Sequence, residues 1–321
     1  KMNHKKYSRQ ILLEKVGQKG QEKLNKKKVA IIGIGALGTV AASLLARAGV
    51  ENLLLIDRDC IEESNLQRQI LFTEKDIGKS KAEIAKLKIK EINSHCKVGV
   101  EAIHLGTKNL GLLEETDLIL DCTDNLDTRF LINDFCKKKK KPWIYAAAIE
   151  TKGYIMPILP EGPCLSCFLK EASLDTCDTV GVLNTITTTI AAIQVTLAIK
   201  ILLDEKVDPL LSHYNIWDNK LKQIKIKKRE NCNSCQGNYS YLNSQENKTP
   251  LRFCTSGVFQ IQGKPNKLNE IKEKLEKSGT VIVDKETLRF KNLTLFEDGR
   301  VLIRANSEKE ALATYSRFVG N

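Results

Sequence analysis

Short apolar runs and longer segments of helical spacing alternate along the first half of the chain. The runs are rich in β-branched and aliphatic residues, as in strands that are buried on both faces, and they span 29–32, 52–56, 98–104, 118–120 and 143–148. Helical patterns lie between them, notably at 80–92 and 125–137. Strands that alternate with helices in this way predict an α/β fold with a doubly wound, mostly parallel, Rossmann-like sheet.

The pattern changes after Glu150. Residues 153–159 and 212–226 have the character of antiparallel strands, so we expect an antiparallel extension of the sheet. Between them, residues 183–203 form a long apolar segment of helical type. It is the best candidate for a membrane span, but it contains several threonines, Gln194 and Lys200. We therefore interpret it as a buried helix and expect no contact with a membrane.

A polar stretch separates the C-terminal part from the rest. We expect a first domain over 1–236 that carries the chemistry, a linker over 237–250 and a small α+β module over 251–321. In this module, Asp298–Gly299 is the strongest hairpin-turn signal of the chain. The other expected elements are strands near 257–262, 280–283 and 288–290, and helices at 267–277 and 308–318.

Composition narrows the class of protein. Of the 321 residues, 42% are hydrophobic, which is ample for a core. The formal net charge of +12 comes largely from lysine runs, which are either solvated helix ends and loops or a surface for an acidic partner. Aromatic residues amount to only 6%, so no nucleic-acid partner is expected. Ten cysteines without an export signal predict metal or thiol chemistry in the cytoplasm.

A glycine-rich turn follows the first apolar run. Gly33, Gly35 and Gly38 form G-x-G-x-x-G at the start of a helical segment, 36–48. Such glycines allow a tight turn and a close approach of the backbone to phosphate at a helix N-terminus. Asp57 ends the next apolar run, where a carboxylate can accept from ribose hydroxyls. The turn therefore predicts a nucleotide site but leaves NAD and ATP open.

The residues after Asp57 favour ATP. Asn65 and Arg68 lie in NLQRQ, and Lys81 lies in IGKSKAE, so cations are available for a triphosphate. Asp121 and Asp124 follow the strand 118–120, at the sheet edge where a carboxylate can hold Mg²⁺ on nucleotide phosphates. Two plainer alternatives stay open. Asp124 could cap the next helix, and the cations could be exposed surface charges.

Two cysteine pairs share one spacing. Cys164 and Cys167 form C-x-x-C, and Cys232 and Cys235 repeat it. A single pair could be a redox motif, and two pairs could be accidental in a cysteine-rich chain. Two pairs of equal spacing favour a tetrahedral Zn²⁺ site of four thiolates, which leaves no open position and is structural.

Nine motifs together resemble a known family. They are YSRQILL, GIGALGTVAASLLARAGV, LLIDRD, SNLQRQ, IGKSKAE, DCTDNLDTR, AAAIETKG, PCLSC and NCNSC. Over Tyr7–Gln236 the sequence is similar to the adenylyltransferases of the ThiF/MoeB/HesA type, which activate ubiquitin-like proteins. The C-terminal part resembles the short tail module of some prokaryotic members.

The resemblance implies that the chain uses ATP to adenylate the C-terminal Gly-Gly carboxylate of a small ubiquitin-like or sulfur-carrier protein, releasing pyrophosphate. Such a carboxylate is ionised at pH 7, so it needs cations and positioning rather than a general base. The resemblance also implies a homodimer, in which Arg9 acts on the phosphates of the partner subunit's site. The resemblance further implies that Asp57 holds the ribose and that Asp124 holds Mg²⁺. The triphosphate would be bound by Asn65, Arg68 and Lys81.

Cys177 lies where members of this family carry a cysteine that can take part in acyl transfer. Asp175 and Asp178 flank it, and their charge would raise rather than lower the pKa of the thiol. Transfer of the activated carrier to Cys177 is therefore left open. A sulfur donor or conjugating enzyme acting afterwards is expected to be a separate protein.

Two rival functions remain. An NAD-dependent oxidoreductase would keep the glycine turn and Asp57, but it leaves the cations and the cysteine pairs unexplained. A non-catalytic scaffold of the same family would be expected to lose Arg9, Arg68, Lys81 and Asp124, which this chain has kept. The sequence does not identify the carrier or its pathway.

Overall fold

The computed structural model describes residues 5–169, 181–243, 251–252, 258–262, 268–284, 287–297, 299–305 and 307–319. The chain divides into two compact units, Lys1–Ser244 and Gln245–Asn321. Each unit has its own sheet and its own apolar packing, with a core on each face of the sheet in the first unit.

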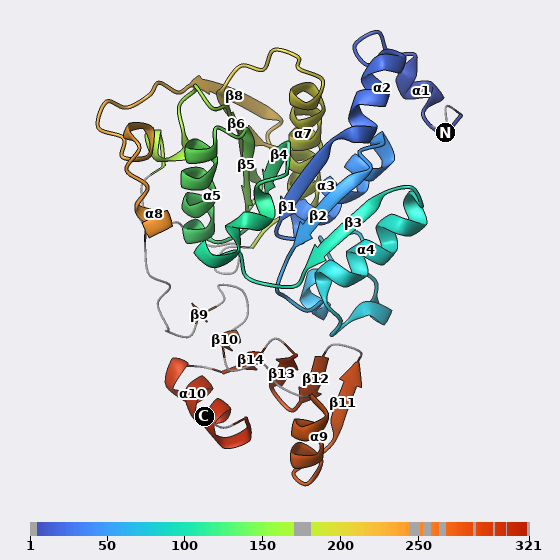
Figure 1. Cartoon of the computed structure of the whole chain (residues 1–321), viewed down its shortest axis with the longest axis vertical. Coiled ribbons are helices and arrows are strands. Elements are labelled where there is room, and N and C mark those ends of the chain that lie inside the picture. Colours follow the sequence, from blue (N-terminus) through green and yellow to red (C-terminus); the bar gives the residue numbers. More distant parts are fainter. Residues whose placement is uncertain are drawn as a thin grey trace. The chain divides into compact units, whose positions relative to one another are not determined.

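The first unit is built on an eight-stranded sheet in the order β3-β2-β1-β4-β5-β6-β7-β8 (Figure 1). Its first five strands are parallel: β1 (Lys28–Ile32), β2 (Asn52–Ile56), β3 (Lys97–Glu101), β4 (Leu118–Asp121) and β5 (Trp143–Ile149). The last three continue it antiparallel: β6 (Lys152–Ile158), β7 (Leu210–Asn215) and β8 (Lys220–Lys225). This confirms the predicted fold class. The strand expected at 98–104 ends at Glu101, because the chain leaves the sheet toward a 3-10 helix, Thr107–Leu113.

Alternate residues of β1 face two different cores, as the period of a strand requires. Val29 and Ile31 pack with α3 (Ala36–Ala48), α4 (Lys81–Ile92) and α7 (Asn184–Leu202). Ala30 and Ile32 pack on the side of α5 (Leu126–Lys139). With β2 on one side and β4 on the other, β1 lies where the strand order reverses, and open sheets bind ligands at the carboxyl ends of such strands.

Helix α7 packs against α3 and the sheet. It runs in the same direction as α3, because the C-terminal ends of both helices lie at the N-terminal segment. It is 19 residues long and apolar enough to cross a membrane. In the fold, its side chains Ile186, Ile190 and Val195 are buried in the core that contains α3. Its C-terminal end lies near the N-terminal helices, since a Cβ atom at Gly20 would be 3.2 Å from the Leu203 side chain.

Two helices precede the sheet, α1 (Ser8–Ile11) and α2 (Gly17–Lys26). Tyr7 is buried, and its hydroxyl accepts from Asn93 Nδ2 at 3.0 Å. Gln10 Nε2 donates to Ala48 O at 2.8 Å. The N-terminal segment is therefore fixed to the C-terminal ends of α3 and α4.

The described part of the second unit is a six-stranded antiparallel sheet in the order β11-β12-β13-β14-β10-β9, with two helices. Its core contains Leu275, Phe290, Leu295 and Ile303. The predicted hairpin pairs β13 with β14; Asp298 itself is outside the described residues. The elements are β9 (Leu251–Arg252), β10 (Val258–Gln262), α9 (Leu268–Glu276), β11 (Val281–Asp284), β12 (Thr287–Phe290), β13 (Leu293–Phe296), β14 (Arg300–Arg304) and α10 (Glu308–Phe318). A short helix, α8 (Ser240–Asn243), closes the first unit.

Candidate nucleotide site and metal centre

The glycine turn joins β1 to α3, and a side chain at each of its three glycines would meet different surroundings. Gly33 has a φ of +89°, and a Cβ atom there would lie 2.6 Å from the carbonyl oxygen of Cys122. A Cβ at Gly38 would lie 1.9 Å from Gly33 O. At Gly35, Gln69 Nε2 is the single atom of the described residues that a Cβ would meet within 4 Å, at 3.8 Å. As far as the described residues go, the space over Gly35 is thus open at the N-terminus of α3, where main-chain N–H groups attract an anion.

Asp57 is fixed beside this turn. Its carboxylate accepts the N–H of Ile34 at 2.6 Å and the N–H of Asp59 at 2.7 Å. The side chain is buried. Burial and the charge of Asp59 raise the pKa of Asp57 to about 6, although Lys81 acts in the opposite direction. The carboxylate is held at the end of β2, the position suited to ribose hydroxyls.

Lys81 is the second buried charge of the site, at the first position of α4. Its Nζ atom lies 3.3 Å from Asp59 Oδ2. Burial alone would lower the pKa of Lys81, but the carboxylates of Asp59, Asp57 and Asp124 together raise it, so the amine stays cationic. The interpretation of Lys81 as an exposed surface charge is therefore wrong.

A short turn over residues 65–69 carries Asn65, Arg68 and Gln69. Asn65 is buried, and its Oδ1 accepts the N–H of Glu62 at 3.1 Å. Arg68 is half-buried, with Nη1 donating to Ser64 O at 2.8 Å. Asn184 Nδ2 donates to Gln67 O at 3.1 Å, which ties the turn to the N-terminus of α7. The parallel helices α3 and α7 therefore both begin at the edge where the nucleotide residues lie.

The two acidic residues after β4 differ in environment. Asp124 is exposed, and it does not cap α5, because Asn125 Oδ1 accepts the N–H of Thr128 at 2.9 Å. The capping alternative for Asp124 is therefore wrong. Asp121 is fully buried and lies 3.1 Å from Arg129 Nε. Its charge is balanced by this arginine, so the expectation that Asp121 faces a ligand is not met.

Sequence reasoning missed two residues that fix the loop carrying Asp124. Arg129 donates to Thr123 O, and to Ala146 O at 3.2 Å. Gln194 Nε2 donates to Asp121 O at 2.9 Å and to Ile144 O at 3.1 Å. Gln194 was recognisable as a polar interruption in an apolar helix, and Arg129 as part of the DCTDNLDTR motif.

Arg9 lies away from the other residues of its own chain that are predicted to bind the nucleotide. It is exposed on α1, beside the contact of Gln10 with Ala48. Ala48 ends α3, whose 13 residues separate it from the glycine turn by about 20 Å at 1.5 Å per residue. Cys177 lies outside the described residues.

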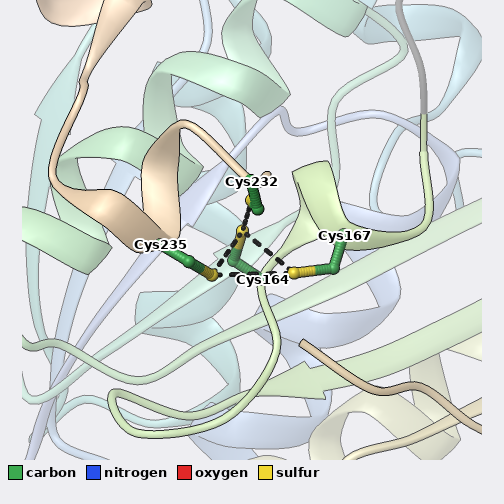
Figure 2. Close-up of side chains that lie close together, drawn as sticks. All are labelled: Cys164, Cys167, Cys232 and Cys235. Atoms are coloured by element: carbon green, nitrogen blue, oxygen red, sulfur yellow. Dashed lines mark hydrogen bonds between the residues drawn. The ribbon is translucent and has the colours of Figure 1, made fainter. Parts of the chain in front are cut away.

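The four predicted metal ligands come together as a separate centre. The Sγ atom of Cys164 lies 3.9 Å from that of Cys167 and 3.5 Å from those of Cys232 and Cys235, and Cys167 lies 3.6 Å from Cys235. Figure 2 shows the four sulfur atoms pointing toward one another. Zn–S bonds of about 2.3 Å give a tetrahedron with edges of about 3.8 Å. The cluster thus fits a zinc ion in geometry and donor type.

Helix α5 supports this centre through two adjacent residues that sequence reasoning did not single out. Asn133 Oδ1 accepts the N–H of Leu165 at 2.9 Å. Asp134 is buried, and it accepts from Ser234 Oγ at 2.5 Å and from the N–H of Tyr241 at 3.0 Å. These bonds hold both cysteine segments in place, the role that surrounding hydrogen bonds have at metal sites.

The glycine turn, with the space over Gly35 at the switch point of the sheet, is the nucleotide-binding arrangement of Rossmann-type folds. The chain belongs to the ThiF family, whose sequence profile matches residues 7–235. Named relatives from three kinds of organism are adenylyltransferases or activating enzymes, and this chain is an adenylyltransferase of the same type.

Three relatives show how far the similarity extends. The chain is 33% identical to the sulfur carrier protein ThiS adenylyltransferase of Bacillus subtilis, over 98% of this chain and 99% of the relative. It is 34% identical to the SAMP-activating enzyme E1 of Haloferax volcanii, over 71% of this chain and 87% of the relative. It is 38% identical to the adenylyltransferase and sulfurtransferase MOCS3 of Drosophila ananassae, over 71% of this chain and 53% of the relative.

Solved structures share the fold of the first unit. MccB of E. coli, solved with MccA-N7isoASN, is similar with a TM-score of 0.65 and 25% identity, over 72% of this chain and 74% of that one. MccB of E. coli solved with ATP is similar with a TM-score of 0.64 and 24% identity, over 73% of this chain and 75% of that one. This similarity supports the fold.

Proposed function

We propose that the protein uses ATP to adenylate the C-terminal Gly-Gly carboxylate of a small ubiquitin-like or sulfur-carrier protein, with release of pyrophosphate. The observation that carries this proposal is the glycine turn with space over Gly35, in a chain that aligns almost end to end with a ThiS adenylyltransferase. The reaction is assigned to residues 1–236, because every residue with a proposed role lies there.

The residues around the turn each bind a different part of the nucleotide. Asp57 accepts from the ribose hydroxyls, and the N-termini of α3 and α7 face the phosphates. Asn65, Arg68 and Lys81 bind the triphosphate. The positive charges of Arg68 and Lys81 offset repulsion between the carboxylate and the phosphates. Asp124 is exposed beside Lys81 and would hold Mg²⁺, which supplies further positive charge for the leaving pyrophosphate.

Arg9 acts in the neighbouring subunit of a homodimer. Its position at the far end of α3 supports this assignment, since it leaves Arg9 outside its own site. Two apolar side chains next to it are exposed, Leu12 by 75% and Leu13 by 58%, and Ile70 near Arg68 is exposed by 57%. Pairing of two subunits would cover apolar surface at both places.

Two further assignments concern cysteines. The four-cysteine centre holds a structural Zn²⁺, because four thiolate ligands leave no position for a substrate. Four adjacent thiolates persist in a reducing compartment, which favours the cytoplasm. Transfer of the activated carrier to Cys177, followed by a sulfur donor or conjugating enzyme, would be a later step, because attack on phosphorus needs no thiol.

ATP–pyrophosphate exchange tests the proposal. The first probe is ThiS of Bacillus subtilis, followed by each small Gly-Gly-ended protein of the genome that encodes this chain. Exchange should require the carrier, and removal of its last two glycines should abolish exchange. Equal exchange with the truncated carrier, or NAD binding in place of ATP binding, would refute the proposed function.

A further inference from the structure

Gln69 is a buried polar residue to which the roles above assign nothing. Its side chain is 3% exposed, and its Oε1 atom is buried without a hydrogen-bond partner among the described residues. A buried acceptor left in this way costs free energy, and such groups are rare in folded proteins. The arrangement therefore suits an acceptor whose donor arrives with a substrate.

The amide of Gln69 lies at the glycine turn. Its Nε2 atom is the only neighbour, at 3.8 Å, that a Cβ on Gly35 would meet within 4 Å among the described residues. The main-chain N–H of Gln69 donates to Asn65 O at 2.9 Å, so the residue stands on the turn that also carries Arg68. That turn is in contact with α7 through Asn184. The amide is thus fixed at the border of the opening where phosphate is expected.

We propose that Gln69 is a further catalytic residue of the adenylation reaction and contacts both reactants through the two ends of its amide. Its Nε2 group donates to an oxygen of the α-phosphate above Gly35. Its Oε1 atom accepts the N–H of the last peptide bond of the carrier. The proposal rests on the function proposed above, because it needs a carrier tail beside the nucleotide.

The contribution of Gln69 is orientation. One carboxylate oxygen of the carrier forms a bond to the α-phosphorus, the bond from that phosphorus to the bridging oxygen of the β-phosphate breaks, and pyrophosphate leaves with the electron pair. No proton is transferred, so Gln69 exchanges none. By holding the last glycine and the α-phosphate at once, the amide keeps the attacking oxygen close to phosphorus.

The variant Gln69→Leu separates this role from a structural one. Leucine needs no hydrogen-bond donor, so the free protein should keep or gain Tm. Carrier-dependent exchange should nevertheless slow by about 10²-fold in kcat, as for loss of one preorganised contact. Gln67→Leu changes an exposed residue of the same turn and is the matched control, with wild-type rate and Tm expected. A lower Tm in Gln69→Leu with parallel loss of activity, or a wild-type rate, would overturn the proposal.

Contact with the carrier is tested by removing the donor. ThiS of Bacillus subtilis, or the carrier that gives the fastest exchange, is prepared with N-methylglycine as its last residue. Wild-type exchange should slow at least about tenfold, and Gln69→Leu should show no further loss. Equal slowing in both proteins overturns the carrier contact. Absence of wild-type exchange with every unmodified carrier would instead reject the proposed function itself.

Discussion

The metal centre and the nucleotide site differ in whether their buried polar groups have partners within the protein. Around the cysteines, protein groups satisfy one another, as Asp134 does for Ser234 and Tyr241. At the nucleotide site, Asp57 and Asp59 place like charges side by side, and Gln69 keeps an acceptor that no described residue satisfies. The surroundings of the four cysteines are complete within the chain, whereas we expect those of the proposed nucleotide site to become complete only with substrate.

This difference separates stability from activity. Groups that are satisfied within the chain contribute to folding, and groups kept for a ligand are tolerated at some cost in stability. Substitutions at the cysteines should therefore act mainly on the fold. Substitutions around the glycine turn should act mainly on the reaction.

The largest effect is expected at the metal centre. Cys232→Ser removes one of four ligands, and because binding energy at a structural site is folding energy, Tm should fall by about 10 °C or more. Metal content should fall from one zinc per chain at the same time. Both are measured on one sample, by thermal denaturation and elemental analysis.

The matched control is Cys96→Ala. Cys96 is a buried thiol in the core on the other face of the sheet, so its loss should cost about 1 kcal/mol and leave metal content unchanged. If active wild-type protein contains no zinc, the assignment of a structural zinc ion is wrong. An unchanged Tm in Cys232→Ser would show that the centre does not stabilise the fold.

The nucleotide site should show the reverse pattern. Arg68→Ala and Asp124→Ala each remove one charge from a half-exposed or exposed position. Adenylate formation should slow by about 10²–10³-fold, while Tm stays near that of the wild type. Single-turnover kinetics and thermal denaturation measure the two quantities. A large loss of Tm in either variant would contradict the separation of the two regions.

In both sites the local patterns were predictable, whereas the contacts between distant segments were not. The cysteine spacing and the glycine turn are local patterns, and both specify geometry over a few residues. Arg129 and Asp134 act on groups 17 and 107 residues away, so their roles depend on how β5 and the second cysteine pair pack against α5. The burial of Asp121 likewise follows from its pairing with Arg129 across a turn. Spacing along one segment contains no information on such contacts.

Acidification should weaken nucleoside binding through Asp57. Its pKa is raised to about 6, and the ionised form accepts the ribose hydroxyls, so adenosine affinity should fall about tenfold between pH 7 and pH 5. Adenosine is the ligand for calorimetry because it has no phosphate that titrates in this range. In Asp57→Asn, adenosine affinity should no longer fall between pH 7 and pH 5. If the affinity of this variant still falls as in the wild type, another group is responsible for the pH dependence.

The same shift acts on stability with the opposite sign. A carboxyl whose pKa is higher in the folded protein than its ordinary value of 3.8 binds more protons when folded. The contribution of Asp57 to the free energy of unfolding should therefore increase as the pH falls from about 6 toward 4. Relative to Asp57→Asn, the wild type should gain stability over the range in which it loses adenosine.

Subunit mixing should show that the nucleotide site is completed by a second copy. Arg9→Ala and Asp124→Ala chains are each expected to be inactive alone. Random assortment gives half heterodimers, each with one intact composite site, so the mixture should recover about a quarter of wild-type activity. No recovery after verified exchange of subunits, or an active monomer by light scattering, would contradict the assignment of Arg9.

The smallest effect on the first step is expected from a thiol outside the metal centre. Cys177→Ala should leave pyrophosphate exchange near the wild-type rate, because a carboxylate attacks phosphorus without help from a thiol. Any defect should appear afterwards, as loss of a hydroxylamine-sensitive or reducible link between enzyme and carrier. Both assays are run on the same variant. Loss of exchange in a natively folded variant would overturn this order of steps, and full activity in both assays would show that the enzyme does not use Cys177.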